Sequence, residues 1–472
     1  MNWTRYVFLC TATLCGAIWP NILRASSAEV RGAQSLPAEI QNIVSVETGK
    51  RDSASHLELG VVYDQHTLPA WGNAEADRAA KRILAESHYY QAVFLMGWGS
   101  ANPEPSPGVY DWSSLDRRIG IILETGGIPV INLCCAPDWM RGGEPGKTDW
   151  VKLARTAPNS DRFGDFVDLV RKVAQRYPSV KYYQVWSELK GFWNKSERRW
   201  DYEGYTTLYN LVYSALKAQN PDIKVGGPYM TIVPRLVARR PSELKGPYGE
   251  IEQDSLDVIQ YWLAHKKGAD FIAVDGTSAP LDGGAPADVF ANTQIFTDVD
   301  EWIRARTDLP IWWSEYYPVP NNHKNNLPIG DYGPDEQNAL LTETLMRMAP
   351  AAVVALRWAP EGDAHEPVNG DQASVWSDTT QPGGGGQPFP FAVSMKEFSA
   401  CFPRSEMLIS TKVLGANLAV LAGTNCTLLV NEADTPVAIR LNGYVQTLKP
   451  YEVRFDHGLN QPVGPVKASP NQ

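Results

Sequence analysis

One pattern repeats eight times along this chain: a short apolar run typical of a strand, then an amphipathic run typical of a helix. The predicted strands lie at residues 57–63, 90–96, 128–133, 181–186, 223–226, 271–274, 310–313 and 353–358. The predicted helices lie at residues 74–87, 115–125, 160–176, 202–219, 255–265, 299–306, 335–348 and 392–402. Strands that alternate with helices form parallel sheets, because each helix returns the chain to the same edge. The sequence therefore predicts an α/β fold in which residues 57–402 close into a (β/α)8, or TIM, barrel.

A doubly wound open sheet is the alternative for such a pattern, but it seldom contains eight units in one run. The first predicted strand is not followed by a glycine-rich phosphate loop, which disfavours a dinucleotide-binding fold. Ser160 is a plausible N-cap for the third predicted helix.

The pattern changes after Phe402, where short β-rich runs are separated by turn residues such as Asn442 and Gly443. Residues 403–460 are therefore predicted to form an antiparallel, β-sandwich-like accessory domain. The lead-in segment 29–56 contains one strand-like stretch, Ile40 to Val46, which is expected to add a strand to that domain. Residues 461–472 are interpreted as a flexible tail.

The first 28 residues have the pattern of an export signal. A short segment with one basic residue precedes an uncharged apolar run from Val7 to Ile18, and small residues at 26–28 offer a cleavage site. The alternative is an uncleaved anchor, although the run is short for a membrane span. We expect a secreted or periplasmic protein with no membrane span once the signal is removed.

Charge and composition exclude some classes of partner. The formal net charge is -10 and no basic stripe is present, so nucleic acid is not an expected partner. The chain has 16 Trp and 20 Tyr, which suits sugar stacking but equally suits a large core. No Cys or His spacing suggests zinc, and we expect no metal and no cofactor. A Cys401–Cys426 bridge is left open, and Cys134 and Cys135 point to opposite faces if they lie on a strand.

Two glutamates occupy the positions where barrel enzymes place their catalytic groups, the carboxyl ends of strands. Glu188 follows the fourth predicted strand and Glu315 follows the seventh. These strands are not neighbours, so the two side chains can face each other across the barrel mouth. A facing pair suits glycosidic cleavage, because one carboxyl group donates a proton while the other attacks the anomeric carbon. The aromatic neighbours Trp186, Trp312 and Trp313 are expected to desolvate one carboxyl group. Either glutamate alone is more commonly a surface or ion-pair residue.

Four segments resemble glycoside hydrolase family 39, a family of retaining (β/α)8-barrel glycosidases. Residues 186–193, Trp-Ser-Glu-Leu-Lys-Gly-Phe-Trp, resemble its acid/base segment, Trp-Asn-Glu-Pro-Asn followed by Phe-Trp. Residues 313–316, Trp-Ser-Glu-Tyr, resemble its nucleophile segment. Residues 107–112 and 137–140 resemble its loops after strands two and three, and the terminal β-domain is similar as well. The resemblance covers residues 57–460 and implies that Glu188 is the acid/base and Glu315 the nucleophile.

Two positions depart from the family pattern. Ser187 stands where the family has an Asn that binds the sugar 2-hydroxyl, and Asp275-Gly276 stands where a His or Tyr is often found. Topology suggests further sugar contacts, although core packing is an equal alternative for each. The expected substrate-binding residues are Trp98, Asn132, Trp139, Ser187, Tyr229, Tyr317 and Trp358.

The leading hypothesis is a secreted retaining glycoside hydrolase that cleaves O-glycosidic bonds of a poly- or oligosaccharide by double displacement. The alternative is a catalytically inactive carbohydrate-binding barrel that serves polysaccharide assembly or export. A third hypothesis is a structural protein of an export system that merely keeps the fold.

Overall fold

The computed structural model describes residues 43–457, apart from His88, 282–287, 319–331, 363–374, Pro382 and Asn442. The expected export signal and tail lie outside the described residues. Among the helices that are described, none is both long and apolar enough to cross a membrane.

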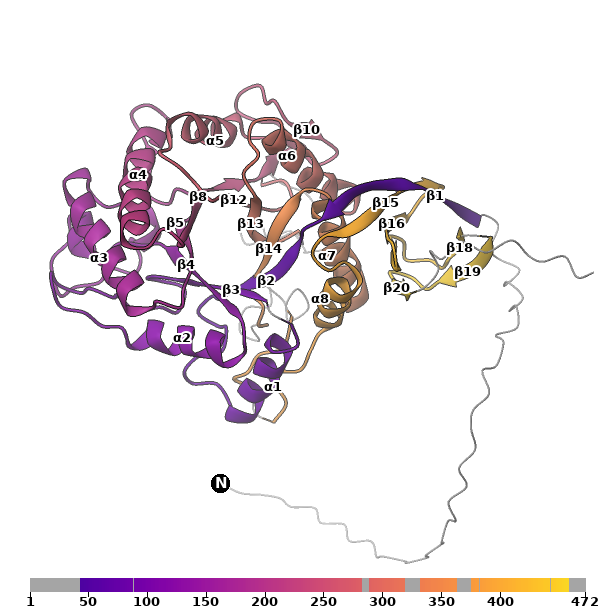
Figure 1. Ribbon diagram of the computed structural model, residues 1–472, viewed down its shortest axis with the longest axis horizontal. Helices are drawn as coiled ribbons and strands as arrows, with labels where there is room; N and C mark the ends of the chain where they lie inside the picture. The colour runs from indigo at the N-terminus through magenta and orange to yellow at the C-terminus, as the bar shows by residue number, and fades with distance from the viewer. Residues whose placement is uncertain are drawn as a thin grey trace, which may run out of the picture. The chain divides into compact units, whose positions relative to one another are not determined.

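Eight parallel strands form a closed barrel, which confirms the predicted fold class (Figure 1). Each strand pairs with the next one along the chain, and the last returns to the first. In chain order the strands are β2 (Glu58–Val62), β3 (Tyr90–Phe94), β4 (Ile128–Leu133), β5 (Tyr182–Val185), β8 (Lys224–Ile232), β12 (Phe271–Gly276), β13 (Ile311–Tyr316) and β14 (Ala352–Trp358).

The helices that follow these strands surround the barrel in Figure 1. They are α1 (Ala74–Leu84), α2 (Ser113–Glu124), α3 (Phe163–Arg176), α4 (Tyr202–Gln219), α5 (Gln253–His265), α6 (Gln294–Arg304), α7 (Pro334–Met348) and α8 (Pro390–Cys401). The prediction for Ser160 was wrong: it opens the 3-10 turn η3 (Ser160–Arg162), and α3 begins at Phe163 without a side-chain cap. Asn73 and Asp201 do cap α1 and α4 with their side chains.

Three barrel strands extend further than their apolar runs predict. The strands β8, β12 and β13 continue to Ile232, Gly276 and Tyr316, through glycine, proline, aspartate and serine residues. These residues have low strand propensity, but pairing with buried neighbouring strands overrides it. The extension matters because it places Tyr229, Asp275 and Glu315 on the barrel wall.

An aromatic cluster fills the barrel near the start of its strands. The Trp312 ring lies 5.2 Å from that of Tyr90, 5.3 Å from that of Tyr182 and 4.1 Å from that of Phe271. All four residues are the first or second of their strands. Trp312 therefore packs at the amino end of the barrel, where it does not serve the expected desolvation of a carboxyl group. The candidate active site lies at the other end of the barrel, at the carboxyl ends of the strands.

The second sheet has seven strands in the order β19-β18-β1-β15-β16-β17-β20. Strand β1 (Ile43–Ser55) pairs antiparallel with β15 and parallel with β18, so the segment before the barrel is central to the sheet. Side chains of the two end strands meet, since Arg454 and Gln446 are hydrogen-bonded. The sheet thus folds over an apolar core in a sandwich-like manner. The remaining strands are β15 (Glu406–Leu414), β16 (Leu418–Gly423), β17 (Cys426–Asn431), β18 (Val437–Leu441), β19 (Tyr444–Leu448) and β20 (Val453–His457).

The sheet packs on the barrel through α7 and α8, which contact β17 and β20. A disulfide joins Cys401 at the end of α8 to Cys426 at the start of β17, which answers the question that the sequence left open. A second disulfide joins Cys134 to Cys135. These two residues follow β4 instead of lying on it, so the expectation of opposite faces does not apply.

Candidate active site

Glu188 lies in a tight turn directly after β5. The backbone φ angles of Trp186, Glu188 and Leu189 are +72°, +50° and +44°, a region that residues with side chains rarely occupy. Two hydrogen bonds hold the turn: the Glu188 N–H donates to the Tyr229 carbonyl over 2.8 Å, and the Trp186 indole donates to the Lys190 carbonyl over 2.8 Å. Strained backbone of this kind is concentrated at functional sites, where surrounding contacts maintain it.

Glu315 and Tyr229 owe their orientation to irregular strand pairing. Between β12 and β13 the register shifts at Ser314, so that Glu315 lies beside Asp275. Between β12 and β8 the register shifts at Tyr229, whose φ is +56°. Such bulges re-aim side chains and are common next to active sites. Here they bring the Tyr229 hydroxyl to Glu315, to which it donates a hydrogen bond.

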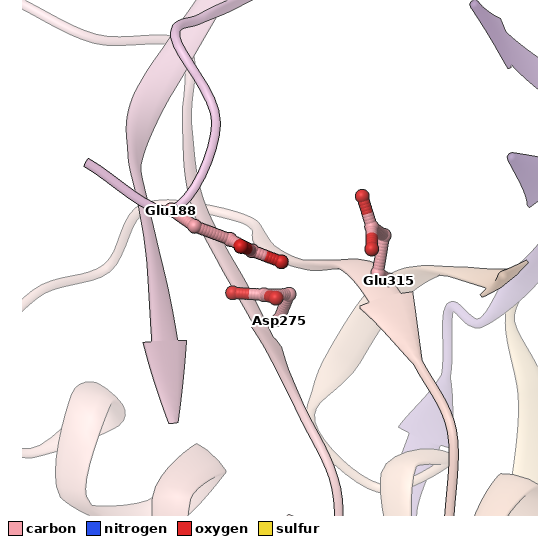
Figure 2. Close-up of side chains that lie close together, drawn as sticks. All are labelled: Glu188, Asp275 and Glu315. Atoms are coloured by element: carbon pink, nitrogen blue, oxygen red, sulfur yellow. The ribbon is translucent and has the colours of Figure 1, made fainter. Parts of the chain in front are cut away.

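Three carboxyl groups converge at the carboxyl ends of the strands. One oxygen of each of Glu188, Asp275 and Glu315 lies within 4.8 Å of the other two. Figure 2 shows the Glu188 side chain reaching above Asp275 toward Glu315. Glu315 and Asp275 are buried, whereas the Glu188 side chain is 26% exposed and thus accessible from outside.

Lys190 supplies a positive charge to this cluster. Its ammonium group forms an ion pair with Glu188 and lies 5.0 Å from the centroid of the Trp98 ring. Burial alone would lower the pKa of Lys190, but the charges of Glu188, Glu315 and Asp275 outweigh it and raise that pKa. Three carboxylates are also a donor set for a metal ion, but a cation already shares this cluster, so we assign no metal to it.

The electrostatic environments of the carboxyl groups differ. Burial works to raise the pKa of Glu188, but the Lys190 charge and hydrogen bonds with Lys190 and Asp275 hold it below its usual value. Burial and the Glu188 charge raise the pKa of Glu315 to about 8, against the opposing effects of Lys190 and Tyr229. Burial, followed by the charges of Glu188 and Glu315, raises the pKa of Asp275 well above its usual value.

Three of the expected sugar-binding residues contact the carboxyl groups or Lys190, and a fourth, Trp358, packs on the same phenylalanine ring as Trp98. Tyr229 contacts Glu315, and the Tyr317 hydroxyl lies 3.5 Å from Asp275 Oδ2. The Trp98 ring lies beneath the Lys190 ammonium and 4.4 Å from the Phe94 ring. Trp358, the last residue of β14, packs 6.1 Å from that same Phe94 ring.

The other three expected residues have different surroundings. Asn132 and Ser187 are buried, and their side-chain polar atoms have no hydrogen-bond partner among the described residues. Buried polar groups are normally satisfied, so these atoms are candidates for contact with a bound molecule or water. Trp139 is buried in the 3-10 turn η1 (Asp138–Arg141), and its indole donates to the Glu104 carbonyl over 2.9 Å. Its one polar atom is thus used inside the protein.

Sequence reasoning missed Lys190 and Asp275. Asp275 was considered only as a departure from the family pattern, yet it lies in the cluster. A signal was available, because an aspartate that directly follows a buried apolar strand lies at the functional edge of a barrel. Lys190 offered no comparable signal, since only the turn after β5 returns its side chain to Glu188.

An eight-stranded barrel with two facing glutamates at the carboxyl ends of non-adjacent strands defines a class, the barrel glycosidases. The family described as Glycosyl hydrolases family 39 matches residues 101–329, just under half of the chain, and this stretch includes Glu188, Asp275 and Glu315. The resemblance to family 39 is confirmed over this stretch, and the chain is a glycosidase. Its substrates are accordingly carbohydrates.

Solved structures show the same fold. A monomeric β-xylosidase from Caulobacter crescentus CB15 has a TM-score of 0.56 at 18% identity, over 84% of this chain and 83% of that one. A family 39 enzyme from Xanthomonas axonopodis pv. citri has a TM-score of 0.53 at 16% identity, over 85% and 76%. A family 39 glycoside hydrolase from the gut symbiont Bacteroides cellulosilyticus WH2 has a TM-score of 0.54 at 15% identity, over 85% and 80%. No curated protein matches the chain.

Proposed function

We propose that this protein is a retaining glycoside hydrolase that uses Glu315 as nucleophile and Glu188 as acid/base. The observation that carries the proposal is the approach of the two carboxylates, with oxygens within 4.8 Å. Retaining enzymes place the two carboxyl groups about 5–5.5 Å apart, whereas inverting enzymes need about 6.5–9.5 Å to admit a water molecule. The short approach favours direct attack by one carboxylate.

Two displacements make up the reaction. In the first, Glu315 attacks the anomeric carbon and forms an ester, the bond to the leaving oxygen breaks, and Glu188 protonates that oxygen. In the second, Glu188 removes a proton from water, the water oxygen bonds to the anomeric carbon, and the ester to Glu315 breaks. The exposed side of Glu188 suits a group that meets both the leaving oxygen and the water.

The two residues need opposite protonation states at the start of the reaction. Glu315 must be ionised to attack, and its pKa near 8 makes the protonated form dominant at neutral pH. Glu188 must be protonated to act as an acid, and Lys190 favours its ionised form. The carboxyl groups titrate together, so the pH profile reports the coupled group instead of either residue alone.

Candidate substrates come from related folds. The structural neighbours include proteins described as β-xylosidases and as a glucosidase from Croceicoccus marinus. A nitrophenyl β-xyloside and a nitrophenyl β-glucoside are therefore the first probes, followed by a panel of plant and bacterial polysaccharides. We propose a poly- or oligosaccharide as the substrate.

We also propose that the protein is exported, to the periplasm or the medium. The apolar run from Val7 to Ile18 is one argument. The two disulfides are another, because such bonds persist in oxidising compartments. N-terminal sequencing of the mature protein tests this proposal, and cleavage near residue 28 is the expected result.

Mutation of the two glutamates distinguishes their roles. Glu315→Ala removes the covalent step, so even an activated nitrophenyl glycoside turns over very slowly. Glu188→Ala is still glycosylated by such a substrate but then stalls, and azide releases a glycosyl azide of retained configuration. Azide rescue of Glu315→Ala with retention, and none of Glu188→Ala, would reverse the roles. Two variants that both equal the wild type would exclude both residues.

Two observations favour a second function, a carbohydrate-binding barrel without catalysis. The Lys190 ion pair holds Glu188 ionised, and Ser187 replaces the asparagine that the family pattern places beside it. Saturable binding on a glycan array, with no turnover of the bound glycan by the wild-type protein, would establish this function in place of hydrolysis.

A further inference from the structure

Neither displacement step uses Asp275, the third member of the carboxyl cluster. It is fully buried at the carboxyl end of β12, and the Tyr317 hydroxyl lies 3.5 Å from its Oδ2. Its Oδ1 is buried and has no donor among the described residues. Its carboxyl group is nevertheless within hydrogen-bonding reach of Glu188.

Two carboxyl groups in hydrogen-bonding contact share a proton, because two carboxylate oxygens cannot bond without one. The neighbours decide which group holds it. Glu188 has the Lys190 ammonium as a counter-ion, whereas Asp275 forms no ion pair among the described residues, and the Lys190 charge acts on it less than the charges of Glu188 and Glu315 do. A buried carboxyl group without a counter-ion takes up a proton, since desolvation penalises its charge.

The other groups around Asp275 agree with this assignment. The groups that face it are Glu188 and Lys190 from the turn after β5, Tyr229 from β8, Glu315 from β13 and Tyr317 beyond it. Two of these are acids, whose charges oppose ionisation of Asp275. Burial raises the pKa of both tyrosines well above the usual value, so they remain neutral donors.

We propose that Asp275 is a positioning residue that stores the proton that Glu188 delivers to the leaving group. This inference rests on the proposed hydrolytic function. In the resting state the Asp275 hydroxyl donates to the Glu188 carboxylate, and Lys190 balances the single negative charge that the pair carries.

The proton balance of both half-reactions follows. As the glycosidic bond breaks, the proton of Asp275 moves to Glu188 and a proton moves from Glu188 to the leaving oxygen, which departs as an alcohol. Asp275 is then ionised. As water attacks, its proton moves to Glu188 and on to Asp275, while the remaining hydroxide bonds to the anomeric carbon and Glu315 leaves as a carboxylate. Lys190 keeps its charge throughout.

The kinetic test compares Asp275→Asn with the wild type on two glycosides of the same sugar. Asparagine keeps the shape of aspartate and donates to Glu188, but it transfers no proton. We expect kcat/KM to fall about 10²-fold or more on an alkyl glycoside, which needs acid assistance, and less than about 10-fold on a nitrophenyl glycoside. The basic limb of the pH profile should move to lower pH. Equal losses on both glycosides, with an unchanged pH profile, would show a merely structural role and overturn the proposal.

Asp300→Asn is the matched control. Asp300 is a buried aspartate on α6 that accepts a hydrogen bond from the Trp313 indole over 2.9 Å, away from the cluster. Any loss in this variant should be the same for both glycosides. If the kcat/KM of Asp300→Asn depended on the leaving group as strongly as that of Asp275→Asn, this would count against a specific role of Asp275.

Infrared difference spectroscopy locates the proton without relying on turnover. At neutral pH the wild-type spectrum minus that of Asp275→Asn should show the carbonyl band of one protonated carboxylic acid. Absence of that band would overturn the proposal even in an active enzyme. If the wild type cleaves no glycoside, the proposed hydrolysis fails, while this spectrum still decides whether Asp275 holds the proton.

Discussion

Lys190 forms an ion pair with Glu188, the residue two positions before it in the turn that follows β5. The pair joins a cation to the proposed acid/base of the reaction. The charge of Lys190 also acts on Glu315 and Asp275. Lys190 is therefore expected to set the pH range in which the enzyme works.

Lys190→Met should move both limbs of the pH profile of kcat/KM to higher pH. Lys190 favours the ionised forms of Glu188 and of Glu315, so its removal raises the pKa of each. An opposite charge in contact shifts a pKa by about 1–3 units, and we expect a movement of about one unit or more in each limb. Lys195→Met, an exposed lysine later in the same loop, is the control and should leave the profile in place. A Lys190→Met profile that coincides with the wild type would contradict this role.

Tyr229→Phe should move the acidic limb to higher pH and lower kcat/KM by about 10- to 100-fold. The Tyr229 hydroxyl donates to Glu315, and hydrogen bonds to charged groups contribute about 1.5–3 kcal/mol. Without this donor the ionised, nucleophilic form of Glu315 is less favourable. A pH profile of the purified variant measures the effect. Tyr317→Phe provides the comparison, because its hydroxyl contacts Asp275 instead, so its acidic limb should move less.

The barrel was predictable because its signal is local and repeated. Each apolar run and each amphipathic run is visible in the sequence without knowledge of its neighbours. The strand ends were not predictable, since residues such as Pro228, Asp275 and Ser314 join strands only through pairing with buried neighbours. The prediction that Ser160 caps a helix was wrong because a 3-10 turn and an α-helix begin with the same residue types.

The candidate site was predictable where topology alone decides. Glu188 and Glu315 follow from their positions at strand ends, and their placement in one cluster agrees with that reasoning. The electrostatic partner Lys190 did not follow, because its contact depends on three positive φ angles in one turn. The bulge at Tyr229 was equally invisible, since a register shift leaves no mark in composition or periodicity.

Removal of the Cys401–Cys426 disulfide should destabilise the protein by about 3 kcal/mol, because the bond closes a loop between residues 25 positions apart. Urea unfolding of Cys401→Ala, Cys426→Ala and the double variant measures this loss. Either single replacement already opens the loop, so the three variants should lose similar stability. If the double variant instead lost the sum of the two single stability losses, packing of the cysteine side chains, and not the bond, would be responsible.

Glu432→Gln should reduce the loss of stability that the protein suffers as pH rises. Burial and the charge of Glu343 raise the pKa of Glu432 to about 8, against the opposing charge of Arg347. Between its ordinary pKa and this value the folded state holds a proton that the unfolded state lacks, so stability falls as pH rises. Glutamine does not ionise, so the variant should lose less stability than the wild type as pH rises. We expect its free energy of unfolding, relative to that of the wild type, to be roughly 1–2 kcal/mol higher at about pH 9 than at about pH 5.

The control for this effect is Asp434→Asn, an exposed acid on the same turn. Urea unfolding at the two pH values should give the same difference for Asp434→Asn as for the wild type. A Glu432→Gln protein whose stability falls with pH as steeply as that of the wild type would show that Glu432 is already ionised in the folded state.

Covalent attachment of the sugar to Glu315 is the step that separates double displacement from the other mechanisms, and mass spectrometry can detect it. The Glu188→Ala protein is incubated with an activated nitrophenyl glycoside, quenched in acid, digested and analysed by mass spectrometry. We expect a peptide that contains Glu315 and carries the mass of one glycosyl residue, with the modification on Glu315 itself. A glycosyl group on another residue, or rapid turnover to a product of inverted configuration without any adduct, would contradict it.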